Sequence, residues 1–150
     1  MKYEFTGEVK ICFGRTLHQI RAKISFGNIA KGDIGGWIES EKNLSQEGNA
    51  WVSGDARVFG DACVSGNASI MWISNIGSRS DTTTFFLGKK KEIIVNCGCF
   101  HGTIEQFQEA VEKKHGDNLH GKMYRLAIEM AKMKLQSATN EPPEEGEADE

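Results

Sequence analysis

The sequence lacks the features of a membrane, secreted or large multidomain protein. No apolar run in its 150 residues approaches the ~20 residues needed to cross a bilayer, so no membrane-spanning helix is expected. The N-terminus has no apolar segment followed by a small-residue cleavage site, which predicts a cytoplasmic protein with its four cysteines reduced. A chain of this length holds one compact unit with a second small lobe, which excludes a large multidomain enzyme.

Basic residues are absent from the last fourteen positions, 137–150, whereas the whole chain has a net charge of only −3. This segment is polar, holds both prolines of the chain and contains six acids, namely Glu141, Glu144, Glu145, Glu147, Asp149 and Glu150. It has too little apolar surface to fold, so we predict a disordered acidic tail. Such a tail either binds a partner, as a nucleic-acid mimic does, or only keeps the protein in solution.

A six-residue repeat runs from Gly48 to Met71. Its copies share a small and a bulky apolar position, filled by Ala50, Ala56, Ala62 and Ala68 and by Val52, Val58, Val64 and Ile70. Neither an α-helix nor a plain strand returns apolar residues at this period. The repeat therefore predicts a short left-handed β-helix over residues 32–76, with Ile34, Val52 and Ile70 stacked in one interior column. Calcium-binding repeats are a weaker interpretation, because their period differs and the acids here are sparse.

The predicted fold class is mainly β with α. Residues 1–31 contain β-like stretches that would cap the open end of the β-helix, as the terminal repeats of solenoids must. After the β-helix, residues 77–136 form a ββαα lobe, and the disordered tail of residues 137–150 follows. Large apolar residues at outward positions of the repeat predict oligomerisation, since such residues need a partner surface; they are Trp51, Phe59, Met71 and Trp72.

The ββαα lobe begins with a hairpin whose strands flank the basic turn Gly88–Lys91. Thr103 and Gln106 have the spacing of a capping box, which predicts the start of a helix that ends near His115 and Gly116. A second helix is expected over residues 119–135.

Cys97, Cys99 and His101 raise the question of a metal site or a catalytic thiol. A structural zinc site needs four ligands, and the sequence offers no second pair of cysteines beside these. Nothing in the sequence places a base and an orienting carboxylate next to either thiol. We therefore expect no metal, no cofactor and no catalytic residue, and the two cysteines are interpreted as small strand residues.

The start of the first predicted helix is a better candidate for binding, because free backbone amides at a helix N-terminus attract anions. Neighbouring polar residues could complete a pocket for a phosphate-bearing ligand, which would be lined by Arg79, Asp81, Thr82, Thr84, His101, Gly102, Thr103, His115 and Asn118. The alternative is that these residues are ordinary caps and turns.

Several motifs together resemble a family of small bacteriophage and prophage proteins. They are residues 32–39, residues 43–46, the Gly-Asn-Ala-Trp-Val coil, Cys97–Phe100 with Gly102–Thr103, and His115–Asn118. The repeat alone is also similar to that of hexapeptide acyltransferases, whose β-helices commonly form trimers. The resemblance of the repeat implies a homo-oligomer, with a trimer favoured. The resemblance to phage proteins implies an infected bacterial host and a role against host defence.

Three classes of function follow from these observations: a binding protein, an acyltransferase and a structural phage component. The favoured one is a non-enzymatic counter-defence protein that sequesters a nucleotide immune signal, either a cyclic oligonucleotide or an ADP-ribose derivative. The alternative is a protein-directed inhibitor of a host defence complex, similar to an anti-CRISPR protein. A hexapeptide acyltransferase is disfavoured because the regular coils contain no histidine, and a structural phage component does not account for the helical lobe.

Overall fold

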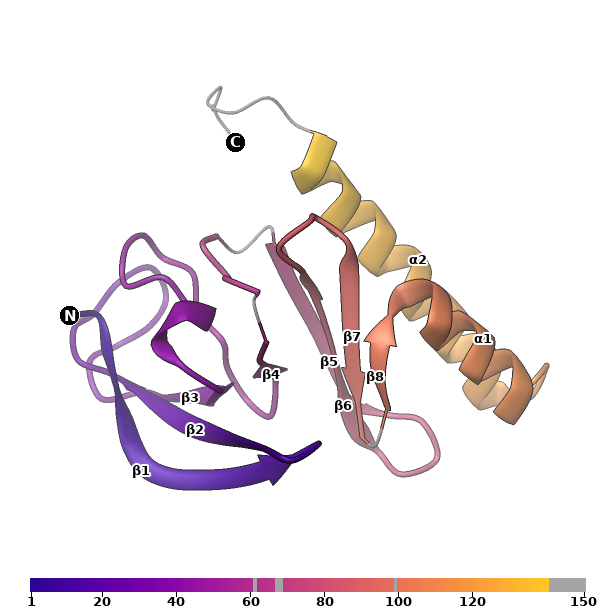
Figure 1. Cartoon of the computed structure of the whole chain (residues 1–150), viewed down its shortest axis with the longest axis horizontal. Coiled ribbons are helices and arrows are strands. Elements are labelled where there is room, and N and C mark those ends of the chain that lie inside the picture. Colours follow the sequence, from indigo (N-terminus) through magenta and orange to yellow (C-terminus); the bar gives the residue numbers. More distant parts are fainter. Residues whose placement is uncertain (61, 67–68, 99, 141–150) are drawn as a thin grey trace.

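The protein consists of two four-stranded sheets and two helices (Figure 1). The computed structural model describes residues 1–60, 62–66, 69–98 and 100–140. The first sheet has the order β1 (Tyr3–Cys12), β2 (Arg15–Ala22), β3 (Ile34–Ile38) and β4 (Arg57–Val58). The second has the order β5 (Ile70–Ile76), β6 (Asp81–Leu87), β7 (Ile93–Cys97) and β8 (Phe100–Thr103). A short 3-10 helix spans Glu41–Asn43, and the chain ends in α1 (Ile104–Lys114) and α2 (Leu119–Asn140).

The second sheet is the central layer of the molecule. Both helices cover one of its faces, and the first sheet with its loops lies against the other (Figure 1). Strand β6 shows why: successive side chains of a strand point to opposite faces. Phe86 joins the core of the first lobe, whereas Phe85 and Leu87 join the core under the helices. Because both faces of this sheet are covered, the last three residues of β6 are all apolar and do not alternate with polar residues.

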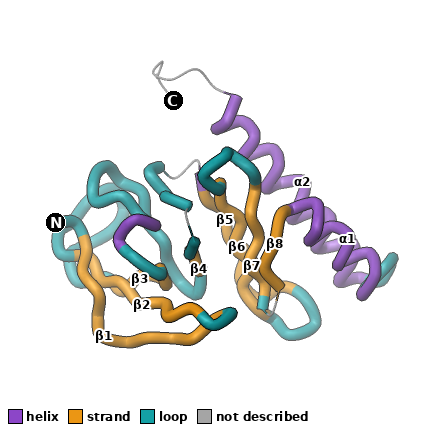
Figure 2. Tube along the Cα trace, in the orientation of Figure 1, coloured by secondary structure: helices purple, strands orange, loops and turns teal. Residues whose placement is uncertain are grey.

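The predicted left-handed β-helix is wrong. The repeat region is mostly loop (Figure 2), and strand β4 is its only strand before β5 within the described part of the chain. Parallel contacts join Ile38 to Val58 and Leu44 to Val64, which in both cases is a separation of 20 residues rather than three repeats of six. Ile34, expected in the interior column, is 50% exposed. After this single parallel layer the chain enters β5, which pairs antiparallel with β6.

The alanines and aliphatic residues of the repeat are nevertheless inside. Among those that the structure describes, the buried set is Ala50, Val52, Ala56, Val58, Ala62, Val64 and Ile70, and Ala68 lies outside the described residues. The prediction of burial was right and that of coiling was wrong, because a six-residue apolar pattern does not fix how neighbouring segments pair. Trp51 and Phe59, predicted to face outward, are also buried within the chain, so they give no support to a trimer.

Residues 1–31 do more than cap an end. Strands β1 and β2 form an antiparallel hairpin, and β2 continues the pairing onto β3. Lys2 is buried beside this hairpin, where its Nζ donates to the carbonyl of Ala50 at 2.8 Å and lies 4.9 Å from the ring centroid of Phe26. Burial lowers the pKa of the Lys2 ammonium, but the carbonyl contacts compensate for the lost water. This side chain therefore ties the repeat loop to the N-terminal hairpin.

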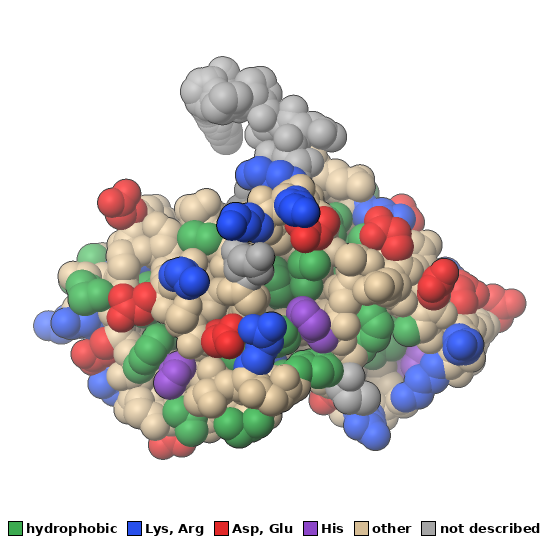
Figure 3. Space-filling view, in the orientation of Figure 1, with side chains coloured by type: hydrophobic (Ala, Val, Ile, Leu, Met, Phe, Trp, Pro, Cys, Tyr) green, Lys and Arg blue, Asp and Glu red, His purple; other side chains and the backbone are tan. Residues whose placement is uncertain are grey.

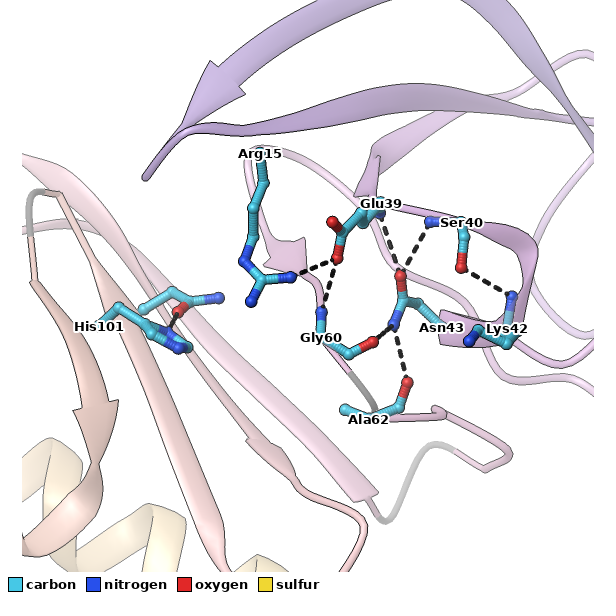
Figure 4. A network of polar contacts seen from close by, with 9 residues as sticks. Arg15, Glu39, Ser40, Lys42, Asn43, Gly60, Ala62 and His101 are labelled. Atoms are coloured by element: carbon cyan, nitrogen blue, oxygen red, sulfur yellow. Dashed lines mark hydrogen bonds and ion pairs between the residues drawn. The ribbon is translucent and has the colours of Figure 1, made fainter.

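A fully buried asparagine holds the loop between β3 and β4 (Figure 4). The Asn43 Nδ2 donates to the carbonyls of Gly60 at 3.0 Å and Ala62 at 2.8 Å. Its Oδ1 accepts from the backbone amides of Glu39 at 3.1 Å and Ser40 at 2.9 Å. One side chain thus binds four backbone groups of the irregular loop layer, of which the Glu39 amide also donates to the carbonyl of Val58 at 3.2 Å, and this helps to explain how that layer can be buried.

The structure confirms the predicted hairpin and the two predicted helices of the C-terminal lobe. Strands β6 and β7 pair antiparallel, and Thr103 and Gln106 form the capping box that starts α1. The helix ends at Lys114, where the amide of Gly116 donates to the carbonyl of Glu112 at 3.1 Å. The lobe also contains β5 and β8, so its sheet has four strands instead of two.

The C-terminal helix is longer than expected. Helix α2 continues through residues 137–140, which the sequence had assigned to the acidic tail, and the predicted disorder of residues 141–150 lies outside the described residues. None of the helices in the described ranges is long and apolar enough to span a bilayer.

Candidate functional site

A cleft of about 260 Å³ opens where the helices meet the end of the second sheet. We refer to it as the helix-side cleft, lined by Ser78, Arg79, Asp81, Cys97, Gly98, Phe100, Phe107, Ala110, Val111, Lys114, His115 and Tyr124. The lining comes from the β5–β6 turn, the β7–β8 connection and both helices. Four separate segments therefore meet at one small space, as is typical of a ligand site.

Aromatic side chains make the floor of the helix-side cleft. Phe107 is the hub, with ring centroids 5.2 Å from Phe100 and 5.4 Å from Tyr124. Phe107 and Val111 are four residues apart on α1 and lie on the helical face that packs against the sheet. Tyr124 is on the buried face of α2 and meets Phe107 edge-to-face at 88°. Because the rings brace one another, the floor is preorganised and needs little rearrangement to receive a planar group.

The hydroxyl of Tyr124 is a neutral group inside the cleft. Burial, followed by the neighbouring Cys97 thiol, raises the pKa of Tyr124, so the phenol keeps its proton. Its oxygen lies 3.6 Å from the Cys97 Sγ, which accepts a hydrogen bond from Thr83 Oγ1 at 3.0 Å. Gly77 makes room for this arrangement, because a Cβ there would collide with the Tyr124 hydroxyl.

Two cations stand at the rim of the cleft. Arg79 comes from the β5–β6 turn and Lys114 from the last turn of α1, and both side chains are exposed. Within the described ranges, no carboxylate lies within ion-pair distance of either one. Asp81 supplies the acidic group of the cleft, and Gly98 lets it approach the backbone, since a Cβ there would lie 2.7 Å from Asp81 Oδ2. The rim is therefore positive overall, with one hydrogen-bond acceptor inside.

His115 closes one side of the cleft. Its ring stacks on Tyr124 at a centroid distance of 5.7 Å and lies 5.5 Å from the ring of His120. Burial lowers the pKa of His115, and the neighbouring His120 and Lys114 lower it further. The imidazole is therefore neutral near pH 7 and can donate or accept a hydrogen bond without adding charge.

The predicted site residues do not form a single pocket. Arg79, Asp81 and His115 line the helix-side cleft. Thr82 instead shares a hydrogen bond of 3.0 Å with the Ser74 hydroxyl, on the β5–β6 hairpin.

The predicted anion site at the start of α1 is occupied by its own capping box. The amide of Thr103 donates to Gln106 Oε1 at 3.0 Å, and the amide of Gln106 donates to Thr103 Oγ1 at 3.2 Å. Gly102 is packed against the same side chain, since a Cβ there would lie 2.5 Å from Gln106 Oε1. Asn118 likewise serves α2, accepting from the amide of Gly121 at 2.9 Å. These residues act as helix caps, the alternative that the sequence also allowed.

His101 points to the other face of the sheet, toward the first lobe (Figure 4), and Thr84 also contacts the first lobe. Thr84 is buried and accepts from the backbone amide of Arg57 at 3.2 Å. His101 packs against Phe59 at 4.7 Å between ring centroids. Asn96 Nδ2 donates to the carbonyl of Arg57, which leaves its Oδ1 to accept from His101, so the His101 Nδ1 carries the proton.

A second cleft of about 120 Å³ lies beside His101, between the two lobes. Arg15 lines it but is already committed, with its Nη1 2.8 Å from Glu39 Oε1 and its guanidinium 5.2 Å from the centre of the Phe59 ring. Glu39 also accepts from the amide of Gly60 (Figure 4). This cleft is smaller and its arginine is paired, so the helix-side cleft is the stronger candidate.

Residues 1–60, 62–66, 69–98 and 100–140 contain no group of three histidine, cysteine, aspartate or glutamate side chains placed to hold a metal ion. Cys99, which the sequence raised as a possible metal ligand, lies outside the described residues.

The face shown in Figure 3 carries interspersed acidic and basic side chains. Among the described residues, it has no surface of a single charge sign of the kind that binds along a nucleic-acid backbone.

We expect the stability of the protein to fall as the pH drops below about 6.5, in part through His101. Burial, and secondarily Arg15, lowers the pKa of His101 below its usual 6.5, so the unfolded chain binds this proton more readily. The contribution of His101 is therefore complete above pH 6.5 and is lost as the pH falls toward the lowered pKa. Urea unfolding of His101→Gln from pH 8 to pH 5 should show a smaller loss than wild type. An unchanged slope would contradict this assignment.

Comparison with known protein families, curated proteins and solved structures finds no match. The resemblance to small phage proteins stays a prediction, and the case for a function depends on the geometry of the helix-side cleft.

Proposed function

We propose that the protein binds a small nucleotide in the helix-side cleft and does not convert it. The observation that carries this proposal is the pairing of an aromatic floor with two cations that have no ion-pair partner among the described residues. Phe107 and its neighbouring rings offer an apolar surface to a base. Arg79 and Lys114 at the rim offer charge-assisted hydrogen bonds to a phosphate.

The polar groups inside the cleft suit the edge of a base. Asp81 accepts hydrogen bonds and would pair with an exocyclic amino group, while the neutral Tyr124 hydroxyl donates to a ring nitrogen or carbonyl. The volume of about 260 Å³ lies just below the usual range for ligand sites of ~300–1,000 Å³. One nucleotide unit fits such a space, so a cyclic oligonucleotide or an ADP-ribose derivative would place one unit inside and the remainder at the rim.

Binding without chemistry is sufficient for sequestration. A protein that holds a signal molecule needs affinity and abundance, and it needs no nucleophile or general base. The resemblance to small phage proteins supports a counter-defence role of this kind, in which the captured nucleotide is a host immune signal. An inhibitor directed at a defence protein is the outcome to consider if nucleotides do not bind.

A thermal-shift screen tests the proposal. The panel should contain adenosine and guanosine monophosphates, cyclic dinucleotides and ADP-ribose, with inorganic phosphate and adenosine as separate controls. A nucleotide at 100 times its dissociation constant adds ~2.7 kcal/mol to the free energy of unfolding, which gives a clear rise in melting temperature. We expect a nucleotide to stabilise the protein more than either control and to be recovered unchanged after denaturation. Stabilisation by none of them would reject the proposal, and recovery of an altered nucleotide would indicate an enzyme.

A further inference from the structure

Helix α2 is apolar on two faces, and among the residues that the structure describes only one of these faces packs against the rest of the chain. The inner face packs on the second sheet through Tyr124, Ala127, Ile128, Ala131 and Leu135. The outer face carries five exposed large residues, which we call the outer stripe: Leu119 (68% exposed), Met123 (40%), Leu126 (67%), Met130 (55%) and Met133 (74%). A helix that serves only as one wall of a core has polar residues opposite that core, so the outer stripe needs another explanation.

The spacing of the outer stripe is that of a helix-pairing seam. Its members follow one another at intervals of four, three, four and three residues, the pattern that places one row of knobs along a helix facing a partner helix. The row is straight, because seven residues make close to two helical turns. Such a seam is built for another helix, and within the described residues no other element of the chain covers it.

We propose that two copies of the chain associate through α2, with the two helices antiparallel and related by a two-fold axis. In that arrangement Met123 of each copy packs against Leu126 of the other, and Leu119 packs against Met130. These four residues are then self-complementary, as the interface of a two-fold dimer must be, and Met133 lies beyond the paired part, opposite position 116 of the partner. The opposed helix dipoles also favour this direction over a parallel pair.

Charges beside the seam agree with this register. Lys122 and Glu129 are both exposed and flank the outer stripe on the same side. The antiparallel packing brings Lys122 of each copy opposite Glu129 of its partner, so the two-fold axis generates two Lys122–Glu129 ion pairs. Shifting the helices by one heptad would instead bring Glu129 against Glu129. A parallel pair would place Glu129 opposite Lys134 but leave Lys122 opposite the buried Ala127, so the antiparallel register is the one that pairs both charges. One antiparallel register is therefore distinguished from its neighbours.

Sedimentation velocity on the full chain at several concentrations tests the pairing. Wild type is expected at twice the monomer mass of 16.6 kDa, with Leu126→Glu shifted to the monomer without loss of helical circular dichroism. Ile24→Glu is the matched control, since Ile24 is 50% exposed in the other lobe and its replacement should leave the dimer intact. A monomeric wild type, a trimer, or a dimer that survives Leu126→Glu would overturn the proposal.

A charge exchange tests the direction of the helices. Lys122→Glu alone and Glu129→Lys alone each place like charges together and should weaken the dimer by about tenfold or more, whereas the double variant Lys122→Glu with Glu129→Lys should restore it. If Lys122→Glu leaves association unchanged while Glu129→Lys weakens it, the helices are parallel and the antiparallel register is wrong. These readouts report association alone and do not depend on whether a nucleotide binds.

Discussion

Replacing Asn43 with aspartate is expected to cost the fold about 3–5 kcal/mol near pH 7, the range for a buried charge left without compensation. The Asn43 side chain is fully buried, and its Nδ2 donates to the carbonyls of Gly60 and Ala62 at 3.0 and 2.8 Å. A carboxylate would lose both donors and direct negative charge at two carbonyl oxygens. Chemical unfolding monitored by circular dichroism measures the loss.

Two expected results distinguish the loss of the Asn43 hydrogen bonds from a general sensitivity of the fold to mutation. Asn28→Asp makes the same chemical change at an exposed position and should alter the free energy of unfolding by less than about 0.5 kcal/mol. Protonation of the new carboxyl at position 43 restores one donor, so the loss should shrink as the pH falls. An Asn43→Asp variant as stable as wild type at pH 7 would show that the four hydrogen bonds do not hold the loop.

Reversing both rim charges, by Arg79→Glu together with Lys114→Glu, is expected to weaken nucleotide binding by about 100-fold or more. Each charge-assisted hydrogen bond contributes about 1.5–3 kcal/mol, and about 1.4 kcal/mol corresponds to a factor of ten in affinity. Both side chains are exposed, so the fold should be preserved. Isothermal titration calorimetry with the nucleotide that gives the largest thermal shift measures the change.

Lys113→Glu is the matched control for this experiment. It changes the net charge by −2, as Lys114→Glu alone does, on the same helix and one position from Lys114, but Lys113 does not line the helix-side cleft. Its affinity should stay within a few-fold of wild type. Equal losses for the control and for the rim variants would mean that only the overall charge matters and that the cleft is not the site.

The C-terminal lobe could be predicted from the sequence because its signals are local. The hairpin needs only two β-prone segments and the turn between them, and α1 needs only Thr103 and Gln106 at its start. These patterns act within a few residues, where propensity and capping decide the outcome.

The first lobe could not be predicted in the same way. The repeat correctly marked the residues that become buried, but the partners of each segment depend on contacts far apart in the sequence. Asn43 bonds to Gly60 and Ala62, and Lys2 bonds to Ala50. No periodic sequence pattern predicts such single side-chain contacts. They hold irregular loops where the repeat had predicted a regular coil.

The site shows a similar division. Arg79, Asp81 and His115 were predicted and line the cleft, whereas its aromatic floor was not predicted. Phe107 and Val111 carried a helical periodicity that indicates burial and gives no sign of an opening beside them. The role of Gly77 depends on the position of Tyr124, 47 residues later, and no sequence pattern connects the two.

Photo-cross-linking with azido-adenosine monophosphate, followed by peptide mass spectrometry, tests most directly whether the helix-side cleft binds a nucleotide. We expect the label on peptides that contain Phe100, Phe107 or Tyr124, and we expect excess unmodified nucleotide to suppress it. Labelling confined to strands β1 to β4, or labelling that excess nucleotide does not reduce, would contradict the account.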